Sequence, residues 1–133
     1  MNVCAEKFTA MLKARNLTYD VFDRADSVLV VFPYKNQKTI FDFQGDDGAH
    51  VQLATIIDTA PEDKFVDIVL ACNQLNSTYR YVKFIVDSDM DIMARTDAIL
   101  DVNSADEECF ELLGRSLKII SDAKAPLMKA IYA

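Results

Sequence analysis

The chain contains 133 residues, 51% of them hydrophobic, and carries a formal net charge of −7 at pH 7. A chain of this length and composition predicts a single folded domain over residues 1–133, whose core needs no disulfide or metal ion. The negative charge disfavours nucleic acid as a partner, because binding to phosphates requires a concentration of positive charge.

The sequence also lacks the segments that direct a protein to or through a membrane. Its apolar runs, such as residues 28–32, are far shorter than a bilayer span, so we expect no membrane partner. The first residues, Met1 to Lys7, show no basic stretch followed by an apolar one, which is the pattern of a secretory signal. The cysteines Cys4, Cys72 and Cys109 are odd in number and far apart, as is typical of reduced thiols in a core. These features together predict a cytoplasmic protein.

The first half of the chain predicts one helix followed by several strands. Residues 3–15 place Cys4, Phe8 and Leu12 at helical spacing, which is typical of an amphipathic helix. Strand-forming residues are concentrated at residues 27–34, 39–43 and 50–57, with a further short strand at residues 19–22. We expect these strands to form an antiparallel meander.

Two turns punctuate this meander. The polar residues 35–38 predict the loop of a hairpin between two neighbouring strands. Gly45 and Gly48 flank two aspartates and mark the clearest turn in the chain, because glycine adopts positive φ without a steric cost.

The second half predicts a helix, two strands and a final helix. The central helix starts at Pro61, where the missing N–H of proline is not needed, and Asn73 and Asn76 lie where asparagine can terminate it. Its apolar stripe consists of Phe65, Ile68, Val69, Cys72 and Leu75. The two strands follow at residues 81–86 and 92–100.

The last helix begins with a capping box, in which Ser104 and Glu107 each bond to the backbone of the other. Its apolar stripe includes Phe110, Leu113, Leu117 and Ile120. Pro126 is expected to end or kink this helix and to leave residues 127–133 as an apolar tail.

This order of elements resembles the fold of type III secretion chaperones and, more closely, the bacterial YbjN family of sensory transduction regulators. The resemblance rests on the helix start Pro61-Glu62, the helix end Asn73-Gln74-Leu75-Asn76, the strand Lys83-Phe84-Ile85-Val86-Asp87 and the capped C-terminal helix. Met90 departs from it, because a tight hairpin more often carries glycine at such a position.

The resemblance implies an α+β fold. We expect an antiparallel sheet of about five strands with three helices, in the order α-β-β-β-α-β-β-α and type III secretion chaperone-like. Chaperones of this class are small acidic homodimers that bind an extended segment of a client protein. The resemblance therefore implies protein binding without catalysis.

No group of residues predicts a catalytic, metal or cofactor site. Asp87, Asp89 and Asp91 alternate as in a Ca²⁺ loop, but Ile92 and Ala98 stand where that loop requires glycine and glutamate, which favours a solvated hairpin turn. No phosphate-binding glycine pattern is present. The single histidine, His50, has no nucleophile near it in sequence and is expected to be a partly exposed strand residue.

The strand at residues 28–32 is apolar on both of its faces. Either helices cover both sides of the sheet, or a second subunit or a client closes one side. We favour a partner surface, and the predicted contact residues are Val28, Val30, Phe32, Phe41 and Phe43. A shift of one residue would exchange the two faces.

The sequence is therefore interpreted as that of a non-catalytic protein-binding module, chaperone-like or a regulatory adaptor, which forms a homodimer and binds a protein client. A small-molecule-sensing regulatory domain with an apolar pocket is the main alternative. An assembly subunit without a client, and an enzyme with carboxylates that converge in one cleft, are further alternatives.

Overall fold

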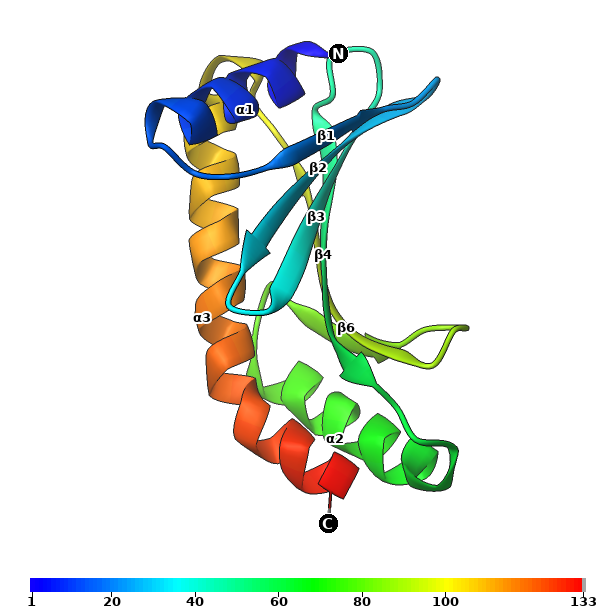
Figure 1. Ribbon diagram of the computed structural model, residues 1–133. Coiled ribbons are helices and arrows are strands. Elements are labelled where there is room, and N and C mark those ends of the chain that lie inside the picture. Colours follow the sequence, from blue (N-terminus) through cyan, green and yellow to red (C-terminus); the bar gives the residue numbers. More distant parts are fainter. Residues whose placement is uncertain (133) are drawn as a thin grey trace.

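The computed structural model describes residues 1–132, and it places three α-helices against one antiparallel sheet (Figure 1). The helices are α1 (Val3–Ala14), α2 (Phe65–Thr78) and α3 (Ala105–Tyr132), with short 3-10 helices η1 (Glu62–Lys64) and η2 (Val102–Ser104) before the last two. The strands are β1 (Asp20–Asp23), β2 (Ser27–Tyr34), β3 (Gln37–Gln44), β4 (His50–Thr59), β5 (Lys83–Val86) and β6 (Asp91–Ile99).

The six strands lie in the order β1-β2-β3-β4-β6-β5. The predicted order of helices and strands is confirmed, with one strand more than the approximate number expected. The short strand expected at residues 19–22 corresponds to β1, which pairs only with β2 and forms one edge of the sheet.

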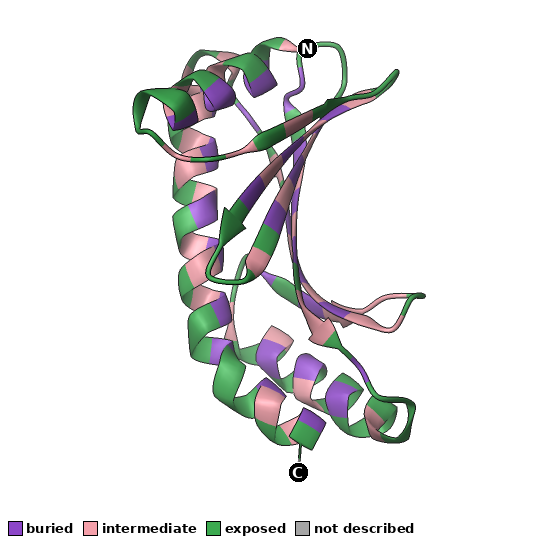
Figure 2. Ribbon diagram, in the orientation of Figure 1, coloured by how far each residue is buried: buried purple, intermediate pink, exposed green. Residues whose placement is uncertain are grey.

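All three helices lie on the same side of the sheet, and α3 runs along its whole length (Figure 1). The buried side chains form two clusters on this side (Figure 2). The first cluster joins α1, β2, β3 and the first half of α3, for example through Phe8, Phe43 and Leu113. The second joins α2, β5, β6 and the second half of α3, for example through Ile68 and Leu127. The hydroxyls of Thr39 and Thr55 form a buried 2.8 Å hydrogen bond on this face of the sheet.

The hairpin between β2 and β3 is tighter than predicted. The strands extend to Tyr34 and from Gln37, which pair with each other, so the loop contains only Lys35 and Asn36. Both residues have positive φ (48° and 64°), as a two-residue turn that matches strand twist requires, and asparagine is favoured there. Pro33 is accommodated because it lies beyond the part of β2 that pairs with β1.

The turn at Gly45 and Gly48 is confirmed, and both glycines have positive φ (89° and 76°). Gly48 also lies directly against Asn2, leaving no room for a Cβ atom. The side chain of Asn2 accepts a 3.0 Å bond from the N–H of Ala5 and donates a 3.1 Å bond to the carbonyl of Phe43. This one side chain caps α1 and fixes it to the end of β3.

The final helix differs from the prediction at both ends. The hydroxyl of Ser104 donates to Glu108 (3.0 Å) rather than pairing with Glu107, and Glu108 also accepts from the N–H of Asp101. α3 continues through Pro126 to Tyr132 and curves towards α2 (Figure 1), so the predicted tail is helical; residue 133 lies outside the described residues. Leu127 and Ile131 are buried in the second cluster, and this packing offsets the backbone hydrogen bond that a proline removes.

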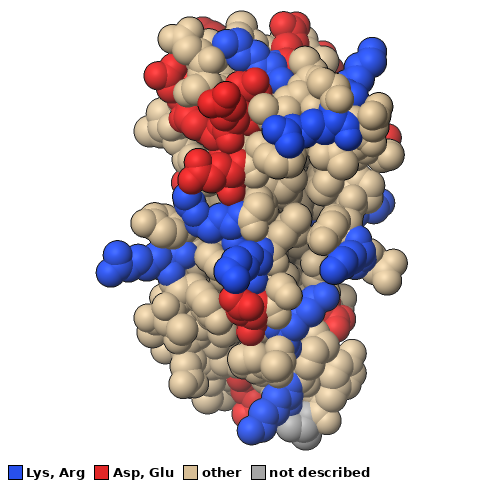
Figure 3. Space-filling model, turned by 90° about the vertical axis from the view of Figure 1, so that its left-hand side faces the viewer, with Lys and Arg blue, Asp and Glu red and all other residues tan. Residues whose placement is uncertain are grey.

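The charges of α3 are segregated along its axis. Asp106, Glu107 and Glu108 lie in its first turn and Lys129 in its last, and both arrangements complement the helix dipole. Figure 3, which views this helical side, shows acidic side chains gathered near one end and Lys and Arg across the middle. Among the described residues, no helix combines the length and apolar character needed to cross a bilayer.

The strand β5 forms the second edge of the sheet, and a side chain of α2 occupies its outer side. The carboxamide of Asn76 accepts a 2.7 Å bond from the N–H of Phe84 and donates a 3.0 Å bond to its carbonyl. Asn76 therefore binds the edge as a neighbouring strand would, and α2 continues past it to Thr78 instead of ending there.

Candidate partner-binding surface

The five predicted contact residues all face the helices. Val28, Val30, Phe32, Phe41 and Phe43 are buried in the first cluster. The ring of Phe41 lies 4.5 Å from that of Phe8 on α1 and 6.0 Å from that of Phe43, measured between centroids. These side chains form the core of the protomer, so the side chains of β2 and β3 that are open to a partner are those at the alternate positions.

The opposite face of the sheet is open, since no described helix lies over it (Figures 1 and 2). The register places Val31, Ile40 and Ala54 in one row across β2, β3 and β4, and all three are half-buried. Further apolar side chains of this face are Phe22, Leu29, Ile56, Ile85 and Met93. This strip, here called the open face, extends from β1 to β5.

A polar row crosses the same face beside the apolar one. Asp42 pairs in register with Leu29 on one side and Gln52 on the other, and Gln52 pairs with Asp97. The amide of Gln44 donates to Asp42 (3.0 Å), and that of Gln52 donates to Asp97 (2.9 Å). The second oxygen of Asp42, Oδ1, is buried and has no hydrogen-bond partner among the described residues.

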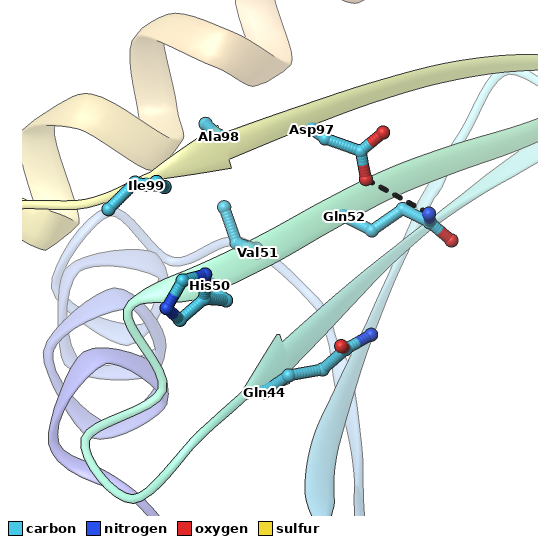
Figure 4. Close-up of a pocket in the computed structure, with 7 residues that line it drawn as sticks. All are labelled: Gln44, His50, Val51, Gln52, Asp97, Ala98 and Ile99. Carbon is cyan, nitrogen blue, oxygen red and sulfur yellow. Dashed lines mark hydrogen bonds between the residues drawn. The ribbon is translucent and has the colours of Figure 1, made fainter.

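One end of this row borders a hollow of about 380 Å³ (Figure 4). Its lining consists of Gln44, His50, Val51, Gln52, Asp97, Ala98 and Ile99. His50 is exposed at the start of β4, as predicted, and Ile99 is 77% exposed at the end of β6. In Figure 4 the side chains of Gln52 and Asp97 meet across the two strands that carry them. The hollow contains no nucleophile beside His50 that would form a catalytic pair.

A second apolar surface lies on the outside of α2. Val66 is 68% exposed and Leu70 62% exposed, and Phe65 and Val69 beside them are also exposed. The sequence stripe placed Phe65 and Val69 in the core, but the residues of α2 that are buried are Ile68, Cys72 and Leu75. The sequence did contain a signal for this second surface, because α2 is apolar on nearly all sides. Such a pattern is typical of a helix that is covered on all sides, and here the protomer itself covers only one of them.

A family model matches residues 5–127 of this chain: YbjN, described as "Putative bacterial sensory transduction regulator". The chain belongs to the YbjN family. No curated protein matches it. Among solved structures, it is similar to a chain of "the heterodimeric complex ExoU-SpcU from the type III secretion system (T3SS) of Pseudomonas aeruginosa", with 14% identity, a TM-score of 0.47 and 96% of each chain covered.

The hairpin of β5 and β6 in this YbjN-family chain carries the three alternating aspartates. Asp87 Oδ1 accepts from the N–H groups of Asp89 (3.0 Å) and Asp91 (2.9 Å), so this carboxylate stabilises the turn. Oxygen atoms of Asp87, Asp89 and Asp91 lie within 4.8 Å of one another. Met90 has a positive φ of 64°, and its backbone bonds to Asp87 and Ala60, so the tight hairpin forms without the expected glycine.

The cysteines of this YbjN-family chain are all buried and free, as predicted. Burial raises the pKa of the Cys72 thiol. Burial, together with neighbouring Cys4, raises the pKa of the Cys109 thiol far above its usual value. A thiol held neutral in this way is a poor nucleophile, which is consistent with a packing role.

We expect these thiols to report on folding through pH. The pKa of each thiol is higher in the folded chain than in the unfolded chain, where it is about 8.5. The contribution of the neutral thiols to the stability of the fold is therefore fully present below this pH and is lost as the pH rises above it. The free energy of unfolding, measured by urea denaturation, should therefore fall above about pH 8.5. Cys109→Ala should show a smaller alkaline loss than the parent chain, and an equal loss in both would contradict this assignment.

Proposed function

We propose that this YbjN-family protein is a non-catalytic protein-binding module, acting in the cytoplasm as a chaperone-like or regulatory adaptor. The observation that carries the proposal is the open face, an apolar strip that crosses the sheet on the side without helices. Large exposed apolar surfaces are uncommon on monomeric soluble proteins and mark interaction sites. Membership of a regulatory family agrees with a binding role.

A capture experiment with a matched variant tests this proposal. The tagged protein and its Ile40→Asp variant are each used as bait in a lysate of the native cell, and bound proteins are identified by mass spectrometry. Ile40 is half-buried on the open face, so aspartate there should leave the fold intact, as circular dichroism can check, and repel an apolar partner. One stoichiometric protein captured by the parent chain and lost from the variant supports the proposal. Capture of the same protein by both baits contradicts the assignment of the open face.

We further propose that two copies associate through the outside of α2. Val66, Val69, Leu70, Asn73 and Ser77 follow one another at helical spacing on its exposed side. None of them is charged, whereas each chain carries a net charge of −7. Two such chains repel each other in general, so contact is favoured where the surface is apolar and neutral.

Sedimentation equilibrium tests this association. The parent chain should have the mass of a dimer, and Leu70→Asp should have the mass of a monomer, because an unpaired charge would be buried in the contact. Ile99→Asp is the matched control, since Ile99 is more exposed than Leu70 (77% against 62%) but lies on β6, and it should remain dimeric. A monomeric parent chain, or a dimeric Leu70→Asp variant, would disprove the contact.

The alternative of a small-molecule sensor is favoured by one further observation. A hollow of about 500 Å³ lies between α2 and α3 and falls in the size range of ligand sites. Its lining consists of Asp67, Ala71, Gln74, Leu75, Thr78, Tyr79, Pro126, Lys129 and Ala130. A rise in melting temperature with one compound of a metabolite panel, abolished by Ala71→Trp, would support this function. No shift with any compound would count against it.

A further inference from the structure

The open face carries one polar atom whose bonding is incomplete. Asp42 lies on this face of β3, and its Oδ2 accepts a bond from Gln44 while Oδ1 has no donor and is buried. An ionised carboxylate offers acceptor sites on both oxygens, and a buried acceptor without a donor is destabilising. Among the described residues it is the single buried side-chain polar atom in this condition.

The chain supplies no cation to this carboxylate. Neither Asp42 nor Asp97, which lies in the same row, belongs to an ion pair within the described residues. The basic residues on this face, such as Lys38 and Arg95, lie outside the row of Asp42. Together with the net charge of −7, this arrangement favours a positively charged partner group at Asp42.

The surroundings of Asp42 are apolar on two sides. Leu29 lies directly across from it on β2, and Ile40 is two residues away on the same face of β3. Phe22, across from Leu29 on β1, is 53% exposed. A partner that places a basic side chain at Asp42 would thus rest its neighbouring apolar side chains on this strip.

We propose that the open face recognises a protein segment in which an arginine is flanked by apolar residues, and that Asp42 binds the guanidinium. Arginine suits this position because its weakly hydrated, planar cation donates several hydrogen bonds and is enriched at interfaces. Because Oδ1 is buried, the guanidinium reaches the carboxylate from the exposed side of Oδ2, beside the amide of Gln44. This inference rests on the proposed function, because it specifies the chemistry of the segment that the open face binds.

Peptide binding tests the inference directly. The probes are twelve-residue synthetic peptides of alternating valine and threonine whose central residue is arginine, glutamine or leucine, titrated by calorimetry. The parent chain should bind the arginine peptide at least about tenfold more tightly than the glutamine peptide. Asp42→Asn should lose this preference, whereas Asp46→Asn, which removes an exposed carboxylate from a nearby turn, should keep it.

The outcomes separate this inference from the function on which it rests. Equal binding of all peptides, abolished by Ile40→Asp, would overturn the role of Asp42 and leave protein binding intact. Loss of the arginine preference in Asp46→Asn, or no binding of the arginine peptide up to about 1 mM, would also overturn it. The proposed function itself fails only if Ile40→Asp changes neither peptide binding nor capture from the lysate.

The free protein provides a second, independent readout. Because Oδ1 lacks a donor, replacing Asp42 by leucine should raise the melting temperature of the unbound chain while it abolishes the arginine preference. A lower melting temperature for Asp42→Leu would show that the carboxylate serves the fold, and would overturn the proposal.

Discussion

Replacing Phe41 with alanine should lower the free energy of unfolding by about 3–5 kcal/mol. Phe41 is fully buried on β3, and its ring contacts that of Phe8 on α1 and lies beside that of Phe43. Removing the ring exposes a cavity between the sheet and α1, which the surrounding side chains can fill only in part. Urea denaturation followed by circular dichroism measures the change.

The neighbouring residue provides the control for this prediction. Ile40 is half-buried and points to the opposite face of β3, so Ile40→Ala should cost about 1 kcal/mol or less. The two substitutions differ by one position in sequence and test which face of the sheet is the core. If Ile40→Ala were as destabilising as Phe41→Ala, the assignment of the faces would be wrong, and Phe41 would return as a candidate contact residue.

Replacing Asn76 with alanine should lower the free energy of unfolding by about 2–4 kcal/mol. The substitution removes both partners of the Phe84 backbone, the acceptor at 2.7 Å and the donor at 3.0 Å. The N–H and carbonyl of Phe84 lie in a partly buried edge, where each unpaired group is destabilising. The same denaturation measurement applies, and amide hydrogen exchange should show faster exchange at Phe84.

Asn73→Ala is the matched control on the same helix. Asn73 is exposed, and its side chain makes no hydrogen bond within the described residues, so alanine there should be neutral or slightly stabilising. Equal effects of Asn73→Ala and Asn76→Ala would show that helix propensity, and not the bond to β5, explains the loss. Unchanged exchange at Phe84 in Asn76→Ala would contradict the bonding itself.

Much of the fold could be predicted because each element shows one clear period. Apolar residues at helical spacing in α1 and α3, and strand-forming residues bounded by turns, indicate the type and order of the elements. The turn at Gly45 and Gly48 was predictable for the same local reason, since positive φ favours glycine.

Which face of the central strands points into the core could not be predicted from the same pattern. Val28 and Leu29 are both apolar, yet only Val28 lies in the core, because the choice depends on where α1 and α3 pack. Side chains of a strand alternate between its two faces, but when both faces are apolar the sequence does not show which set is buried. The pattern therefore could not indicate that the candidate contact residues of these strands would lie on the face that the helices cover.

Other differences arose from contacts between residues distant in sequence. Asn76 was interpreted as a helix terminator, but its partner is Phe84 on a strand. The continuation of α3 through Pro126 depends on the burial of Leu127 and Ile131 against α2 and the sheet. The neighbours of Asp42, on which its proposed role rests, are set by the pairing of β3 with β2 and β4 and could not be read from the sequence.

The bond between Asn76 and Phe84 also limits how this sheet can grow. An isolated sheet has two edges, and a chain with both edges free can add copies at each end without limit, as in a fibril. Here the middle of the four-residue strand β5 is already bonded by α2, while β1 has no strand on its outer side. Assembly through strand edges is thus restricted to β1, and two copies joined edge to edge leave no further edge for a third.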